Sequence, residues 1–294
     1  MFRRKTFRLR APSRTLVLGN RTLLMGVLNV TPDSFSDGGL YLRPDDAVAR
    51  ALQMECAGAD ILDIGGESTR PGADPTPAAE QLRRIIPVLG SLRGRLKIPV
   101  SVDTSNADVA EAAASTGAEI LNDVTSLRGD PRLAEVAARR KLPIILMHMR
   151  GEPRTMQKEP FARNVVRDVI SGLRRAASLA ARSGISKSRI VLDPGIGFGK
   201  SCAQDYELLA RLPEIARLGF PLLVGTSRKK FIGHALGGLP ARERAFGTAA
   251  TVTMSILGGA HIIRVHDIAE MLQVARVTDA VLCPQSAVNL SRSS

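Results

Sequence analysis

Residues 25–39, MGVLNVTPDSFSDGG, are the stretch that decides the fold. The apolar run that begins at Leu23 is typical of a strand buried on both faces, and it breaks off at Asn29. The next ten residues contain Pro32, two aspartates, three hydroxyl side chains and a Gly-Gly pair. A buried strand that leads into a long polar loop is typical of an active site in an α/β protein, whereas an ordinary strand-to-helix connection has about two to six residues.

The same unit recurs along the chain: an apolar run, a polar break and an alanine-rich stretch with helical spacing. The eight apolar runs cover residues 23–30, 60–65, 98–104, 119–124, 142–149, 190–194, 221–226 and 261–266. Glycines such as Gly117 and Gly184 stand shortly before the next run, where helices end. Eight strands that alternate with helices predict an α/β protein with a closed (β/α)8 TIM barrel rather than an open sheet.

No linker divides the chain, so we expect one domain, a barrel over residues 15–284. Residues 1–14 are interpreted as a flexible, basic, solvated tail and residues 285–294 as a C-terminal tail. The three cysteines show no metal-binding spacing and favour a reduced, cytoplasmic compartment. No apolar run approaches the length of about 18 residues that a membrane span requires.

The net charge of +13 suggests nucleic-acid binding, but its distribution argues against that function. Seven basic residues precede Asp33, the first acidic residue, and no aromatic residues alternate with a basic stripe. The charge therefore predicts neither a nucleic-acid nor a membrane partner, and it suits an enzyme with anionic small-molecule substrates.

Each apolar run ends in side chains that form hydrogen bonds or carry charge. They are Asn29, Asp63 with Glu67, Asp103, Asn122 with Asp123, His148, Asp193, Ser227 to Lys229, and Arg264 with His266. A lone aspartate before a helix is usually an N-cap, and a lone histidine is usually a core residue. Because the carboxyl ends of barrel strands meet at one rim, eight such ends together favour an active site.

The rim residues divide by charge. Arg70, Lys229, Arg264 and His266 are cations on neighbouring loops, which predicts a phosphate or diphosphate group in the ligand. Asn29 offers an oxygen to Mg²⁺, which is often bound mainly by phosphate oxygens and water.

Asp103, Asn122 and Asp193 offer acceptors and one amide at the ends of three strands. This set suits a flat heterocycle rich in N–H donors, such as an aminopyrimidine. The alternative is that Asp103 and Asp193 only cap the following helices.

The segment DPGIGFGKS, residues 193–201, resembles a phosphate loop, but three residues instead of four separate Gly195 from Gly199. We therefore exclude ATP binding there, and interpret the glycines as allowing a planar ligand close to the backbone. Ser227 has no histidine nearby in the sequence and no cysteine ends a strand, so no nucleophile is expected. A substitution at a phosphorylated carbon needs only binding and orientation.

Eight motifs resemble, in order, those of dihydropteroate synthases. They are LNVTPDSFSDGG at 28–39, DIGGESTRPGA at 63–73, VDT at 102–104, LNDV at 121–124, MHMRGEPRTMQ at 147–157, DPGIGFGK at 193–200, SRK at 227–229 and RVHD at 264–267. The resemblance implies a (β/α)8 barrel that condenses (7,8-dihydropterin-6-yl)methyl diphosphate with 4-aminobenzoate in folate synthesis. It also implies Mg²⁺ as cofactor, a homodimer and a target of sulfonamides.

The resemblance assigns roles to individual residues. Asn29 would bind Mg²⁺, and Asp103, Lys229, Arg264 and His266 would be catalytic. The substrates would contact Phe35, Thr69, Arg70, Pro71, Asp103, Asn122, Met147, Asp193, Phe198, Lys229, Arg264 and His266. Residues 31–39 would form a lid that closes with Thr69–Pro71 over the aminobenzoate. Lys230 departs from the pattern, because relatives often carry serine there.

Three other functions are considered. A pterin-dependent methyltransferase barrel would not need the STRPG or RVH segments. A non-catalytic pterin-binding paralogue should have lost Asn29, Arg70, Lys229 or His266, all of which are present. Binding of nucleic acid by the basic N-terminus is the third.

Overall fold

Eight parallel strands form a barrel in the computed structural model, which describes residues 4–31, 44–68, 73–151, 155–156 and 162–284. The strands are β3 (Leu23–Asn29), β4 (Ile61–Gly65), β5 (Val100–Asp103), β6 (Ile120–Asp123), β7 (Ile144–Met147), β8 (Ile190–Asp193), β9 (Leu223–Val224) and β10 (Ile262–Val265). Their order is β8-β7-β6-β5-β4-β3-β10-β9, and a parallel bridge between Leu192 and Leu222 closes the ring. The prediction of a (β/α)8 barrel is confirmed.

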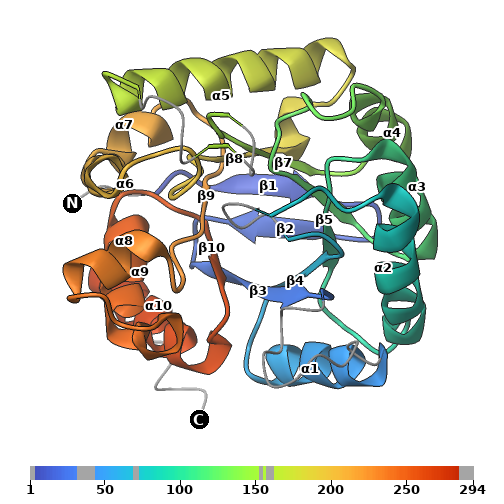
Figure 1. The fold of residues 1–294 in the computed structure, drawn as a ribbon, viewed down its shortest axis with the longest axis horizontal. Coiled ribbons are helices and arrows are strands. Elements are labelled where there is room, and N and C mark those ends of the chain that lie inside the picture. Colours follow the sequence, from blue (N-terminus) through green and yellow to red (C-terminus); the bar gives the residue numbers. More distant parts are fainter. Residues whose placement is uncertain (1–3, 32–43, 69–72, 152–154, 157–161, 285–294) are drawn as a thin grey trace.

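Helices surround the strands (Figure 1). They are α1 (Pro44–Cys56), α2 (Ala78–Leu92), α3 (Ala107–Thr116), α4 (Arg132–Arg140), α5 (Val165–Arg182), α6 (Cys202–Ala210), α7 (Leu212–Ala216), α8 (Lys230–Ala235), α9 (Ala245–Leu257) and α10 (Ile268–Leu282), with short 3₁₀ turns at η2 (Lys187–Arg189) and η3 (Ala241–Glu243). Helix α3 begins and ends at residue types that favour helix ends. Asn106 accepts hydrogen bonds from the first turn of α3, and Gly117, with a φ of 121°, ends the helix. Among the residues that the structure describes, no helix could cross a membrane.

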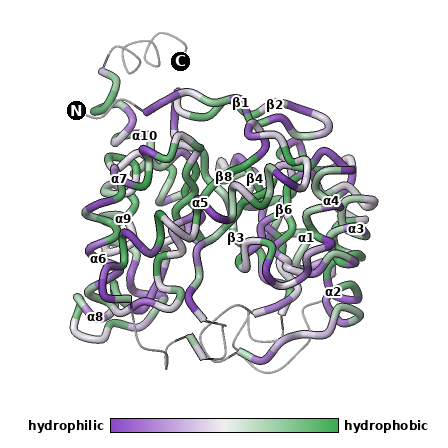
Figure 2. The backbone as a smooth tube through the Cα atoms, turned by 90° about the horizontal axis from the view of Figure 1, so that it is seen from above, coloured by the Kyte–Doolittle hydropathy of each residue, from purple (hydrophilic) through white to green (hydrophobic). Residues whose placement is uncertain are grey.

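An antiparallel hairpin precedes the barrel, formed by β1 (Phe7–Arg10) and β2 (Thr15–Leu18). It lies at one end of the barrel in Figure 2. Leu9 and Leu18 are buried in the same cluster as the barrel residues Leu23, Met25 and Ile61. The hairpin therefore closes the end of the barrel interior at which the strands begin. We call this the lower end of the barrel, because it is opposite the rim formed by the carboxyl ends of the strands.

The prediction that residues 1–14 form a flexible solvated tail is wrong for residues 4–14. Alternating side chains in FRLR place Leu9 inward while the neighbouring arginines face outward. Arg4 is also buried, and it forms an ion pair with Asp279 of α10. The basic composition of residues 4–14 is thus compatible with a short amphipathic strand, in which every second side chain faces inward.

Candidate active site

A buried network of charged and amide groups occupies the carboxyl end of the barrel. Asp63 of β4 has no exposed surface. Its Oδ2 accepts hydrogen bonds from Asn122 Nδ2 at 2.9 Å and from Arg264 Nε at 2.7 Å. Arg264 Nη2 also donates to Asp103 Oδ2 at 3.0 Å. The structure thus brings Asp103, Asn122 and Arg264 together around Asp63.

The electrostatics of this network follow from burial. Burial raises the pKa of Asp103, although the neighbouring Arg264 guanidinium works in the opposite direction. Burial opposes the charge of Arg264 too, but the Asp63 and Asp103 carboxylates hold the pKa of its guanidinium above the ordinary value. Since the ion pair satisfies both groups, we take the arginine as charged and the pair as ionised. The charges of the arginine and the aspartate are therefore in position before a ligand binds.

Asp193 stands at the end of β8 and begins a glycine loop. Its Oδ1 accepts a hydrogen bond from Gly195 N at 2.7 Å, and burial raises its pKa. Lys229 donates from Nζ to the Ile196 carbonyl, and the same Nζ lies 4.5 Å from the centre of the Phe198 ring. Burial lowers the pKa of Lys229 to about 8, with the Asp193 carboxylate opposing that shift. Asp193, Phe198 and Lys229 therefore share one side of the rim.

An apolar wall adjoins these groups. Met147 ends β7 and is 3% exposed. It belongs to a cluster with Val124, Met149 and Met156, against which Phe198 packs. A flat ring held by the carboxylates would lie beside thioether and phenyl groups, which adapt well to such a surface.

His266 lies on another side of the rim, close to the loop after β9. Its Nδ1 is 3.0 Å from Ser227 Oγ, and its backbone N–H donates to the same oxygen at 3.3 Å. The neighbouring Arg228 pairs with Asp267. Ser227 thus orients His266, while Arg264 faces the two carboxylates.

Asn29 ends β3 close to Asp103. A Cβ added at Gly65 would lie 3.5 Å from Asn29 Oδ1 and 3.4 Å from Asp103 Cβ, so a side chain at this position would contact both residues. In the described part of the chain, no cluster of three histidine, cysteine or acidic residues could enclose a metal ion. The donor set fits a Mg²⁺ that takes one amide oxygen from the protein and the rest from phosphate and water.

Some residues singled out in the sequence lie outside the described residues. These are Phe35, Thr69, Arg70 and Pro71, together with nearly all of the lid segment and its glycine pair Gly38 and Gly39.

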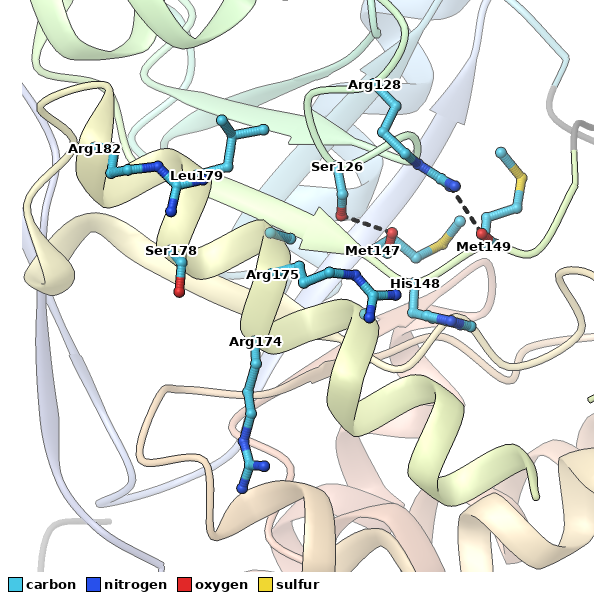
Figure 3. A pocket seen from close by; sticks show the side chains of 12 residues that line it. Ser126, Arg128, Met147, His148, Met149, Arg174, Arg175, Ser178, Leu179 and Arg182 are labelled. Carbon is cyan, nitrogen blue, oxygen red and sulfur yellow. Dashed lines mark hydrogen bonds between the residues drawn. The ribbon is translucent and has the colours of Figure 1, made fainter.

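The side chain of His148, just after β7, faces α5. Its Nε2 is 3.5 Å from Asp168 Oδ2, and burial lowers its pKa, with Asp168 opposing. Figure 3 shows it among the residues that line a cavity beside α5, together with Arg175 and Ser126. This cavity has a volume of about 500 Å³. His148 is therefore adjacent to the rim but does not point into it.

Sequence reasoning did not assign roles to Asp63 or Lys200, both of which are buried. Asp63 was one of several polar residues near strand ends, and no local signal shows that three strands meet at its side chain. Lys200 follows Gly195, Gly197 and Gly199 in a segment that resembles a phosphate loop without its spacing, and this pattern gives the lysine no role.

Comparisons with known proteins agree with this geometry. The model of a family described as pterin binding enzyme matches residues 25–266. A dihydropteroate synthase from Synechocystis sp. is 47% identical over 263 residues, which cover 90% of this chain and 91% of that protein.

Solved structures are similar over nearly the whole chain. A dihydropteroate synthase from Yersinia pestis in a sulfonamide drug complex has a TM-score of 0.89 and 42% identity, covering 94% of this chain and 99% of that one. The synthase from Xanthomonas albilineans with 4-aminobenzoic acid has a TM-score of 0.88 and 42% identity, covering 95% and 99%.

Proposed function

The chain belongs to the dihydropteroate synthases, a family of pterin-binding transferases, and we propose that it catalyses the condensation for which they are named. In this reaction (7,8-dihydropterin-6-yl)methyl diphosphate and 4-aminobenzoate give 7,8-dihydropteroate and diphosphate. The observation that carries the proposal is the buried set of Asp103, Asn122 and Asp193 beside cationic side chains, on a barrel similar to a synthase that binds 4-aminobenzoic acid.

The pterin would bind through its donor-rich edge. The Asp103 and Asp193 carboxylates would accept from the ring N–H groups, and the Asn122 amide would match an edge with both a donor and an acceptor. Met147 and Phe198 would contact the ring and exclude water. An analogue without these donors would leave buried acceptors unpaired and bind poorly.

The substitution would proceed through charge separation. As the C–O bond to the diphosphate breaks, the carboxylates would stabilise positive charge that develops on the pterin, while His266, Lys229 and Arg264 would stabilise the departing anion. The neutral aryl amine then forms the C–N bond and loses its proton afterwards, so no strong base is needed. Because these charges are positioned beforehand, little reorganisation is required at the moment of reaction.

Mg²⁺ is the cofactor we propose, with Asn29 as its protein ligand. When bound, it would neutralise charge on the diphosphate oxygens. Because residue 65 is glycine, no side chain at that position contacts Asn29 Oδ1, which supports this oxygen as the ligand.

We also propose a homodimer in the cytoplasm. Exposed apolar side chains lie on α9 and α10, which pack against each other; they are Phe246, Met254, Val277 and Val281. Such a patch is typical of a protein interface. The three free cysteines suit a reducing compartment. We expect sulfonamides to compete with 4-aminobenzoate.

The test is a direct assay with both substrates and Mg²⁺, in which dihydropteroate and diphosphate are measured by chromatography and mass spectrometry. We expect equal amounts of both products, and loss of turnover when a chelator removes the metal. In Asn29→Ala, half-maximal activity should require more Mg²⁺. Intact pterin binding without any product would contradict the proposal.

A further inference from the structure

Lys200 connects the ends of two neighbouring strands. It is 3% exposed. Its Nζ donates to Gly195 O at 2.8 Å and to Phe198 O at 2.9 Å, both in the loop after β8, and to His148 O at 3.2 Å, just after β7. One ammonium group therefore satisfies three backbone carbonyls from two segments.

The two segments are in unusually close contact. A Cβ on Gly195 would lie 1.9 Å from His148 O, and a Cβ on Gly199 would lie 2.2 Å from Arg150 O. Both glycines also have positive φ values, of 64° and 65°. Carbonyls buried in such a contact need a donor, because an unpaired buried acceptor is costly. Lys200 is the side chain that supplies it.

A second lysine holds the same loop from the ligand side. Lys229 is partly exposed at the rim, donates to Ile196 O and lies over the Phe198 ring. Asp205 of α6 accepts from Gly197 N at 2.6 Å. The loop is thus fixed by Lys229, which a ligand can reach, and by Lys200, which it cannot.

The segments that Lys200 joins carry the pterin contacts we propose. Met147 directly precedes His148, and Phe198 provides one of the three carbonyls. We infer that Lys200 is a positioning residue of the pterin site, whose buried ammonium sets the distance between the Met147 and Phe198 sides of the wall. This inference rests on the proposed function.

The inference is tested by steady-state kinetics of Lys200→Met, which keeps the length of the side chain but removes its charge. We expect the KM for the pterin diphosphate to rise about tenfold or more, while the KM for 4-aminobenzoate changes less than twofold. The control is Lys187→Met at an exposed lysine, which should leave both values unchanged. A folded Lys200→Met with an unchanged pterin KM, or with equal rises for both substrates, would overturn the inference.

Chemical rescue covers the case in which Lys200→Met does not fold. Lys200→Ala removes the atoms from Cγ to Nζ, which propylammonium can replace. Propylammonium should lower the pterin KM of Lys200→Ala, or restore its folding, whereas 1-propanol should not. Equal effects of both compounds, or no effect of either, would overturn the inference. Wild-type enzyme that forms no dihydropteroate in the same assay would instead contradict the proposed function.

Discussion

Two arginines, the buried Arg4 and the partly buried Arg264, bridge distant segments at opposite ends of the barrel. Arg4 pairs with Asp279 and donates to Thr22 Oγ1 at 2.7 Å and to the Ala260 carbonyl at 3.1 Å. Thr22 also donates to both oxygens of Asp279. At the other end, Arg264 pairs with Asp63 and Asp103.

The two networks differ in completeness. Both oxygens of Asp279 are used, and the Arg4 side chain is 4% exposed. In contrast, Asp63 Oδ1 is among the buried side-chain atoms of the described residues that have no hydrogen-bond partner, and the Arg264 side chain is 22% exposed. A complete network stabilises the fold, whereas a buried acceptor without a partner is more often found at a functional site. We therefore expect the lower end to determine stability and the rim to determine activity.

Asp103→Asn should have the largest effect. It removes a charge that stabilises the developing pterin cation, so kcat should fall about 10³-fold, or about 4 kcal/mol. Arg264 keeps Asp63 as a counter-charge and the asparagine can still accept its hydrogen bond, so the free energy of unfolding should fall by no more than about 1 kcal/mol. Turnover and urea unfolding measure both quantities, with the exposed Asp108→Asn as control. Near-normal turnover would remove Asp103 from its assigned role.

Asp279→Asn should have the opposite effect, a large loss of stability with little change in turnover. It leaves the buried Arg4 without a counter-charge, which should cost about 3 kcal/mol of unfolding free energy. The rim is at the other end of the barrel, so kcat at 25 °C should stay within twofold. Stability equal to the wild type would show that the lower network does not hold the fold.

His261 makes the lower end sensitive to acid. Leu222 N donates to its Nδ1 at 3.1 Å, and Nε2 lies 2.9 Å from Lys5 O, so the neutral ring suits both contacts. Burial lowers its pKa to about 4, from 6.5. As the pH falls from 6.5 to 4, the unfolded chain therefore binds a proton first and stability is lost.

Between pH 7 and pH 5 this loss should amount to about 2 kcal/mol. Urea unfolding at the two pH values should show a change that is less favourable by about 2 kcal/mol in the wild type and in the control His234→Gln, at an exposed histidine, than in His261→Gln, because the other groups that titrate in this range contribute equally to all three. An identical pH dependence in His261→Gln and the wild type would exclude this histidine as the cause.

Lys230→Ser should have the smallest effect. Lys230 is exposed at the start of α8, next to Lys229, where its ammonium would attract the carboxylate of 4-aminobenzoate. An exposed pair contributes at most about 1 kcal/mol, so the KM for 4-aminobenzoate should rise no more than about fivefold. High salt should reduce the difference, and a rise that salt does not alter would point to a role other than charge.

The sequence was informative where chemistry follows from strand position. All eight strands were expected where they occur, because buried parallel strands are continuous apolar runs, and Asp103, Asn122 and Asp193 could be placed by their strand ends. The hairpin was missed because arginines interrupt the apolar residues of β1, and because β1 and β2 have only four residues each. The link from Lys200 to His148 could not be predicted, because it joins residues 52 positions apart through a backbone carbonyl.

The most direct test of the contrast between the two ends is the double variant Asp103→Asn/Asp279→Asn. If the ends act independently, it should have the turnover of Asp103→Asn and the unfolding free energy of Asp279→Asn, with coupling below about 0.5 kcal/mol in each quantity. Coupling above about 1 kcal/mol, or loss of turnover in Asp279→Asn alone, would contradict the division between a lower end that stabilises the barrel and a rim that carries the reaction.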